Sequence, residues 1–131
     1  MASPMTLLAS ATQTGSASGA TIPLNTVSML DAILTVTATS GTITAFKLWL
    51  EGSVDGGTTW APMAPDVTAD ASALTCAWTA ATPFVVNVSA APALQSWVAR
   101  YKQTPCNAVR VRWTLTGTTP SVTFAVLACG K

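Results

Sequence analysis

The chain has 131 residues, of which 50% are hydrophobic and 8% charged, with a formal net charge of +1. Near-neutrality excludes a polyanion such as nucleic acid as the expected partner, and the most apolar segment, 27–36, is far shorter than the roughly 20 residues of a membrane span. A single domain of this length buries about two-thirds of its unfolded surface, which is enough for a stable core without disulfides or bound metal.

The low fraction of charged residues predicts that part of the surface is covered. Globular proteins average about 25% charged residues, and charge helps to keep a free monomer soluble. A chain with 8% charged residues is therefore expected to have much of its surface covered by copies of itself or by a partner. A surface rich in Ser and Thr is the alternative.

The N-terminal residues and the cysteines indicate where the protein is made. Residues 1–8 lack a basic start and a sustained apolar run, so we expect no secretory signal and synthesis in the cytoplasm. The chain has three widely spaced cysteines, Cys76, Cys106 and Cys129. An odd number without a signal predicts reduced thiols, buried as small hydrophobic side chains.

The first part of the chain predicts two strands after an N-terminal segment. Residues 1–20 are expected to form an arm or a first strand, with strand character over 6–12, and 21–131 the folded domain. Alternating apolar residues predict strands over 27–39 and 43–52, separated by a Ser-Gly-Thr turn. The side chains expected to point inward are Leu30, Ala32, Leu34, Val36, Phe46, Leu48 and Leu50.

The segment 53–60, Ser-Val-Asp-Gly-Gly-Thr-Thr-Trp, predicts a tight hairpin turn with a return strand over 59–63. Its glycines can adopt positive φ, and Asp55 can accept hydrogen bonds from the backbone amides of the turn. Trp60 is expected to fold back over the hairpin. The pattern resembles the Asp-box of sialidase-type propellers, where it is mostly structural. The residues assigned to this structural hairpin are Ser53, Asp55, Gly56, Gly57, Thr59 and Trp60.

The second half of the chain predicts further strands. We expect a loop over 64–72, strands over 74–79 and 84–89, a short helix or irregular segment over 93–102, strands over 109–116 and 122–129, and a turn over 117–120. The inward residues of the strand 109–116 are Val109, Val111, Trp113 and Leu115. Segments 35–42 and 113–118 resemble each other and are interpreted as equivalent hairpins in two facing sheets.

About eight short strands with frequent turns and little helix predict an all-β fold, a single-domain antiparallel β-sandwich or jelly roll. A propeller is excluded by length, because each blade takes about 40–45 residues and at least four blades are usual.

Catalytic groups are scarce. The chain has no histidine, which removes Ser-His-Asp and Cys-His catalysis and the usual zinc sites. We therefore predict no enzyme activity, no catalytic residues, no cofactor and no metal site. Asp66 and Asp70 are interpreted as solvated loop acids rather than calcium ligands. Glu51 and Asp55 are not favoured as a glycosidase pair, because the turn explains Asp55.

Two features suggest partner contacts. Trp49 lies on the strand face opposite the core, where it is a candidate for stacking on sugar, although packing in the core or a subunit interface is favoured. Four of the six basic residues, Arg100, Lys102, Arg110 and Arg112, lie close together in the sequence. The default interpretation is an ordinary polar face, and the favoured functional interpretation is an anchoring patch for an acidic protein surface. The alternative is a nucleic-acid surface that includes Trp97 and Tyr101.

Segments 34–42, 51–60 and 109–118, in this order, together resemble a group of small tailed-phage virion proteins, over residues 30–131. The resemblance implies a β-sandwich structural protein of the virion. Within that class we expect a capsid decoration (cement) protein on the outer capsid, which binds the major capsid protein and copies of itself, with a homotrimer favoured. A tail or head-fibre component and a carbohydrate-binding β-sandwich module are the alternatives. We expect no nucleic-acid or membrane partner.

Overall fold

The structure is a computed structural model that describes residues 3–24, 27–63, 67–70, 77–79, 82–85, 95–101 and 106–130, with side chains described for 4–24, 27–63 and 106–130. Regular structure in this part of the chain consists of strands alone. No helix among these residues is long and apolar enough to cross a membrane.

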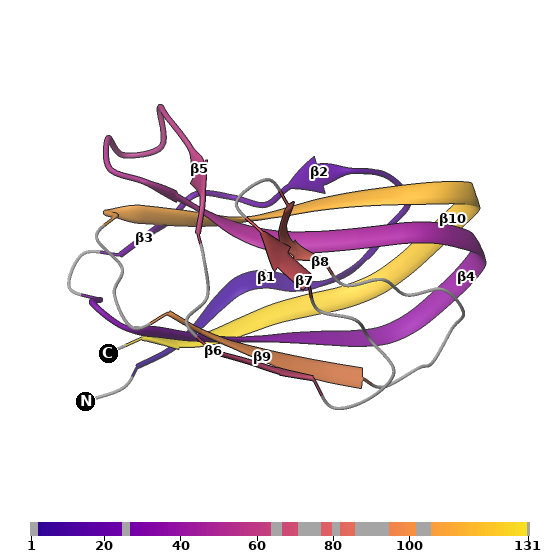
Figure 1. Cartoon of the computed structure of the whole chain (residues 1–131), viewed down its shortest axis with the longest axis horizontal. Coiled ribbons are helices and arrows are strands. Elements are labelled where there is room, and N and C mark those ends of the chain that lie inside the picture. Colours follow the sequence, from indigo (N-terminus) through magenta and orange to yellow (C-terminus); the bar gives the residue numbers. More distant parts are fainter. Residues whose placement is uncertain are drawn as a thin grey trace.

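Two long strands organise the fold. β4 (Leu30–Ser53) and β10 (Ala108–Gly130) pair antiparallel along nearly their whole length. Both strands bend near the middle, so that each contributes one half to each of two stacked layers (Figure 1). The predicted all-β antiparallel sandwich is therefore confirmed, and the jelly-roll variant stays a prediction.

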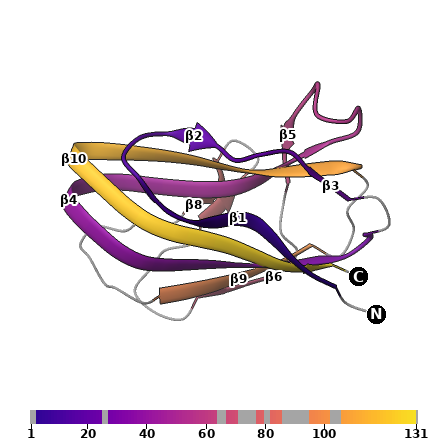
Figure 2. The same ribbon diagram turned by 180° about the vertical axis from the view of Figure 1, so that it is seen from behind.

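The shorter strands extend the two layers on either side of this bent ribbon. In the first layer, β1 (Ser3–Gln13) pairs with the second half of β10, and β9 (Gln95–Tyr101) pairs with the first half of β4 and with β6 (Val67–Asp70). In the second layer, β2 (Ala17–Ser18) and β3 (Ile22–Pro23) pair with the first half of β10, and β5 (Ala61–Pro62) pairs with the second half of β4. Figure 2 shows β1, β2 and β3 following β10 from one layer to the other. A separate hairpin consists of β7 (Ala77–Thr79) and β8 (Thr82–Val85).

The turns predicted at 40–42 and 117–120 do not form, because both strands continue through these residues. Gly41 and Gly117 have φ of 73° and 153°, and the register shifts beside Gly117. A Cβ on Gly41 would collide with the carbonyl oxygen of Thr119, and one on Gly117 with that of Thr42. Bulges of this kind bend a ladder without ending it. The two similar segments, 35–42 and 113–118, therefore meet at one corner and are not separate hairpins.

The core lies between the layers. Phe124 from the first layer contacts Phe46 and Trp113 from the second, with ring centroids 5.1 and 5.4 Å apart. All three are buried, and each ring is expected to contribute roughly 1.5–3 kcal/mol or more by burial. The side chains predicted to point inward are confirmed as buried: Leu30, Ala32, Leu34, Val36, Phe46, Leu48, Leu50, Val109, Val111, Trp113 and Leu115.

Other predicted elements need correction. Residues 95–101 form β9 rather than a helix, because β4 offers them a neighbouring strand edge over Leu30–Val36. The predicted loop over 64–72 contains β6. The first strand is confirmed and is longer than 6–12, whereas the return strand of the hairpin is limited to β5. The strands predicted over 74–79 and 84–89 overlap β7 and β8; the rest of both lies outside the described residues.

Candidate functional site

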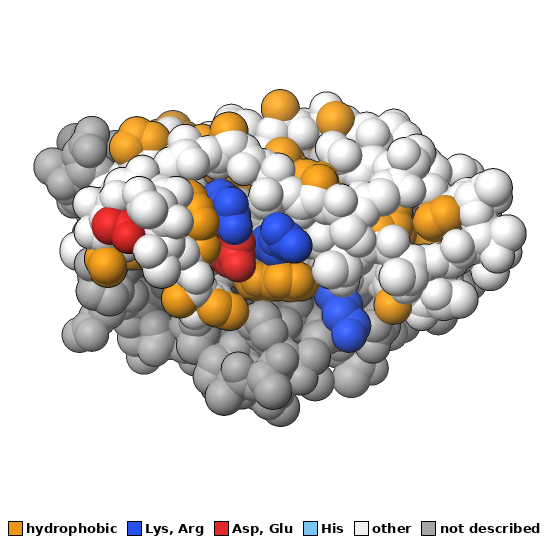
Figure 3. Space-filling view, turned by 90° about the horizontal axis from the view of Figure 1, so that it is seen from above, with side chains coloured by type: hydrophobic (Ala, Val, Ile, Leu, Met, Phe, Trp, Pro, Cys, Tyr) orange, Lys and Arg blue, Asp and Glu red, His pale blue; other side chains and the backbone are white. Residues whose placement is uncertain are grey.

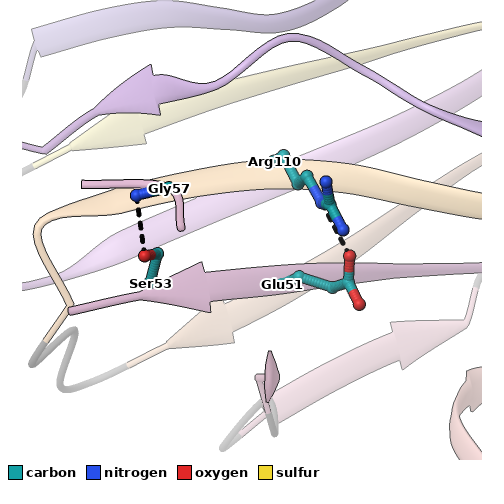
Figure 4. A network of polar contacts seen from close by, with 4 residues as sticks. All are labelled: Glu51, Ser53, Gly57 and Arg110. Carbon is teal, nitrogen blue, oxygen red and sulfur yellow. Dashed lines mark hydrogen bonds and ion pairs between the residues drawn. The ribbon is translucent and has the colours of Figure 1, made fainter. Parts of the chain in front are cut away.

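The hairpin between β4 and β5 projects beyond the second layer (Figure 1). Ser53 is 2% exposed. Its hydroxyl donates to Asp55 Oδ1 at 2.6 Å. The same hydroxyl accepts from the backbone N–H of Gly57 at 2.8 Å, as Figure 4 shows. The same carboxylate oxygen accepts from the N–H groups of Thr58 and Thr59 at 3.1 and 2.8 Å. The hydrogen bonds predicted for Asp55 are therefore present.

These donors hold the pKa of the Asp55 carboxyl well below its ordinary value of 3.8, with the Ser53 hydroxyl the largest cause and the backbone N–H of Thr59 the next. The charged form is favoured because each donor is satisfied by a carboxylate and less well by a carboxylic acid. Asp55 is therefore a structural anion of the turn. Gly56 and Gly57 adopt the predicted positive φ, at 74° and 104°.

Asn107 fastens the hairpin to β10. Its side-chain oxygen accepts from the N–H of Gly56 at 3.1 Å, its Nδ2 donates to the carbonyl of Val54 at 3.3 Å, and its own backbone N–H donates to the carbonyl of Ser53 at 2.8 Å. The sequence contained no local signal for this role, because the three partners lie about fifty positions away in the chain.

Arg110 joins Trp60 to Glu51. The guanidinium carbon lies 4.4 Å from the centroid of the Trp60 ring, and Nε donates to Glu51 Oε1 at 2.8 Å (Figure 4). The ring also lies against the backbone of Gly57, as predicted. Glu51 is thus engaged with Arg110, whereas Asp55 is engaged with the donors of the turn. Charge-assisted and cation–π contacts of this type fix the position of a side chain.

Cationic side chains gather on the outer face of the second layer. On this face Trp49 of β4 is paired in register with Arg112 of β10, Glu51 with Arg110, and Lys47 with Thr114. Figure 3 shows blue side chains next to each other near the centre of the face with a red side chain against them, and a further blue side chain apart from these, beside the grey atoms. We call Lys47, Trp49, Arg110 and Arg112 the cationic face.

The basic cluster expected from the sequence is divided between the layers. Arg100 belongs to β9 of the first layer, where it is aligned with Asp31, while Arg110 and Arg112 lie in the second layer. The side chain of Arg100 and all of Lys102 lie outside the described residues. Lys47 joins the cationic face instead. The sequence did not indicate Lys47 as part of this cluster, because only the pairing of β4 with β10 brings it near Arg112.

Trp49 is half-buried rather than freely exposed, and it packs against the hydrophobic core. No acceptor for its buried indole N–H exists among the described residues. The other described tryptophans are also engaged: Trp113 is buried and donates to the carbonyl of Gly15 at 2.9 Å, and Trp60 carries the Arg110 guanidinium. These three side chains therefore do not form an open row of rings for sugar stacking. The side chains of Trp78 and Trp97 lie outside the described residues.

The burial of the cysteines and the secondary structure around the predicted loop acids differ in part from expectation. Cys129 is exposed, which corrects its predicted burial, because it alternates with buried neighbours on β10; Cys106 is half-buried. Burial raises the pKa of the Cys106 thiol. Asp70 lies in β6, whereas Cys76 and Asp66 lie outside the described residues. No group of three His, Cys, Asp or Glu able to hold a metal ion occurs in the described part of the chain.

The first layer exposes a different kind of surface. Ile33 of β4 and Leu127 of β10 are register partners on its outer face and are 40% and 49% exposed. Met29, just before β4, is 37% exposed. The described Lys and Arg side chains all belong to the second layer. The described cations therefore lie on the outer face of the second layer, and the exposed apolar pair Ile33 and Leu127 lies on that of the first, beside Asp31.

Comparison with known proteins yields similarity of shape alone. No protein-family model and no curated protein matches the chain. The SPBc2 prophage-derived protein YomS is 11% identical with a TM-score of 0.47, over 98% of this chain and 93% of that one. The CBM22-1–GH10 modules of Clostridium thermocellum endo-1,4-beta-D-xylanase 10B are 14% identical with a TM-score of 0.43, over 82% of this chain and 17% of that one. A chain of infectious bursal disease virus, Gx strain, is 12% identical with a TM-score of 0.33, over 99% of this chain and 41% of that one. Since every TM-score is below 0.5, these likenesses carry no argument about function.

Proposed function

We propose that the chain is a non-enzymatic structural protein of a phage virion, and more specifically a decoration protein that binds the outer capsid and stabilises the shell. The proposal rests on the sequence resemblance of segments 34–42, 51–60 and 109–118 to small tailed-phage virion proteins. One structure of similar outline comes from a prophage and another from a virus, which agrees with the proposal but does not carry it.

The structural observation that supports the proposal is an exposed apolar pair on the outer face of the first layer. Ile33 and Leu127 lie side by side on it, 40% and 49% exposed, in a chain with only 8% charged residues. Large contiguous apolar patches usually mark a contact surface, and this pair is the candidate for the centre of one among the described residues. Copies of the chain that cover this face would bury both side chains, and a trimer is the favoured assembly.

The engagement of the acids supports a structural role. The Asp55 carboxylate accepts hydrogen bonds within the hairpin, and the Glu51 carboxylate forms an ion pair with Arg110. A general acid or base needs a carboxyl group that can reach a substrate and change its protonation state near the working pH. Asp55 has a lowered pKa, which keeps it charged. Asp55 is therefore not poised for acid–base chemistry, and Glu51 is held by its contact with Arg110.

The mechanism of stabilisation would be additive burial. A sandwich whose two layers share the same two long strands resists separation of the layers, since β4 and β10 each pass through both. Each contact of such a rigid unit with the shell contributes modestly, and many copies together strengthen the shell against the pressure of packaged DNA.

Particles of the phage that carries this gene test the proposal. Mass spectrometry of purified particles should detect the chain in many copies, and immunogold labelling should place it on the capsid. Gold confined to the tail or to projections would favour a tail or head-fibre component, and absence from the particle would refute a virion role. A glycan array would detect a carbohydrate-binding module through a signal lost in Trp49→Ala.

Light scattering tests the proposed assembly. A trimer would have three times the chain mass of 13.4 kDa. Leu127→Asp should shift the mass toward the monomer, because it places a charge on the apolar face. The matched control is Val54→Asp at the hairpin tip, where the wild-type side chain is 73% exposed; it should leave the mass unchanged. A wild-type monomer would contradict the trimer.

A further inference from the structure

We propose that the cationic face is the docking surface for a protein partner whose contacting surface carries carboxylates, with Trp49 as the central contact between Lys47 and Arg112. The inference rests on the proposed function and assigns the face that meets the shell. The apolar first layer would then contact copies of the chain, and the second layer the partner.

Uncompensated charge is the first support. Of the cations on this face, Arg110 is neutralised by Glu51. No carboxylate pairs with Lys47 or Arg112 within the described part of the chain. Both side chains are half-buried, so that they lie along the sheet rather than extending into water. Side chains held in this way lose less freedom when they bind an anion.

Trp49 is the second support. It faces Arg112 across the strand pair and is two residues from Lys47 on the same face of β4. Trp and Arg are the residues most enriched at the energetic centres of protein interfaces. Because Trp49 already packs against the core, its ring is held in place before a partner arrives. A partner that covers it would exclude water from the flanking ion pairs, which strengthens them.

The number of free cations among the described side chains of this face favours a protein over a nucleic acid. A polyanion is held by many phosphate contacts along a basic track, and Lys47 and Arg112 supply only two. The hairpin end of the face has no free charge to attract a carboxylate, because Glu51 neutralises Arg110 there. Acidic groups of the partner are therefore directed to the Lys47–Arg112 end.

The main test is rebinding to particles that lack this protein, made from the phage with its gene deleted. Lys47→Glu and Arg112→Glu should each weaken binding at least about tenfold (about 1.4 kcal/mol), and the wild-type affinity should fall as salt rises. Trp49→Ala should weaken binding about thirtyfold, as expected of a hot spot. The control, Thr14→Glu with Thr118→Glu, makes the same two-unit change in charge at exposed residues away from this face and should bind like the wild type.

A second measurement keeps this inference separable from the proposed function. Poly-L-glutamate at low salt should change the tryptophan fluorescence of the wild type but not of Lys47→Glu, and poly-L-lysine should have no effect. If the wild type binds particles and both charge reversals bind equally well, the docking face is wrong and the virion role stands. If the wild type does not bind particles, the decoration role fails and the polymer titration decides alone. A response abolished by Lys47→Glu supports an acidic partner, and no response overturns it.

Discussion

Replacement of Gly117 by alanine tests how the sandwich is bent. Gly117 has φ of 153°, and a Cβ there would collide with the carbonyl oxygen of Thr42. A non-glycine residue in such a conformation costs about 1–3 kcal/mol, and shifting a packed strand to relieve the overlap costs about 1–3 kcal/mol more. Together they predict that Gly117→Ala lowers the free energy of unfolding by about 4 kcal/mol.

Urea unfolding followed by tryptophan fluorescence measures this loss. With an m value of about 2 kcal/mol/M, 4 kcal/mol lowers the midpoint by about 2 M. Two other glycines serve as controls. Gly56 has φ of 74° but open space around its Cβ position, so Gly56→Ala should cost only the strain, about 1 kcal/mol. Gly15 has open space and no positive φ, so Gly15→Ala should change little.

The order of the urea midpoints of the three variants tests whether Gly117 holds the bend. If Gly117→Ala unfolds at the same urea concentration as Gly56→Ala, the close approach of β10 to β4 does not hold the bend, and the argument is refuted. A Gly117→Ala protein that fails to fold while Gly56→Ala folds normally is the extreme form of the expected result.

Three further predictions concern the hairpin and its border. Ser53→Ala should lower the free energy of unfolding by about 1–3 kcal/mol, measured by urea unfolding, because it leaves the N–H of Gly57 without its acceptor. Asp55 has a lowered pKa in the folded protein, so its charged carboxylate stabilises the fold fully above the ordinary pKa of 3.8. This contribution is lost as the pH falls through the lower folded pKa. Thermal melts of Asp55→Asn at different pH values should lack this part of the acid dependence. A double-mutant cycle of Glu51→Gln with Arg110→Ala should give a coupling of about 0.5–1 kcal/mol. The coupling should decrease only slightly with salt, because the two side chains are mostly covered, at 13% and 22% exposed.

Each of these has an outcome that contradicts it. The exposed Ser10→Ala is the control for Ser53→Ala, and equal midpoints for the two would remove Ser53 from the hairpin framework. An acid dependence that is the same in wild type and Asp55→Asn would mean that the turn does not hold the charged carboxylate. A coupling near zero at low salt would show that Arg110 is positioned by Trp60 alone.

Strand patterns were the most predictable part of the fold. Val109, Val111 and Trp113 alternate with polar residues, and all three are buried. A strand with one face toward a core leaves this period of two in the sequence. The hairpin was equally predictable from the sequence, because the hydrogen bonds of its motif join residues at most four positions apart.

The strand β9 was not predictable in the same way. Apolar residues over 93–102 recur at helical spacing, and a period alone does not reveal whether a strand edge is available nearby. The structure supplies that edge in β4, so residues 95–101 pair with it. The same reason explains Lys47, which lies near Arg112 only through the register of β4 and β10.

The sequence by itself determined the all-β class, the inward faces of the long strands and the local hydrogen bonds of the hairpin, because these depend on residues close together in the chain. Only the tertiary structure decided that Gly41 and Gly117 bend continuous strands instead of ending them. Glycine allows both outcomes, and the choice depends on whether the paired strand continues alongside. That pairing joins residues far apart in the chain, and it also separates the cationic outer face from the apolar one.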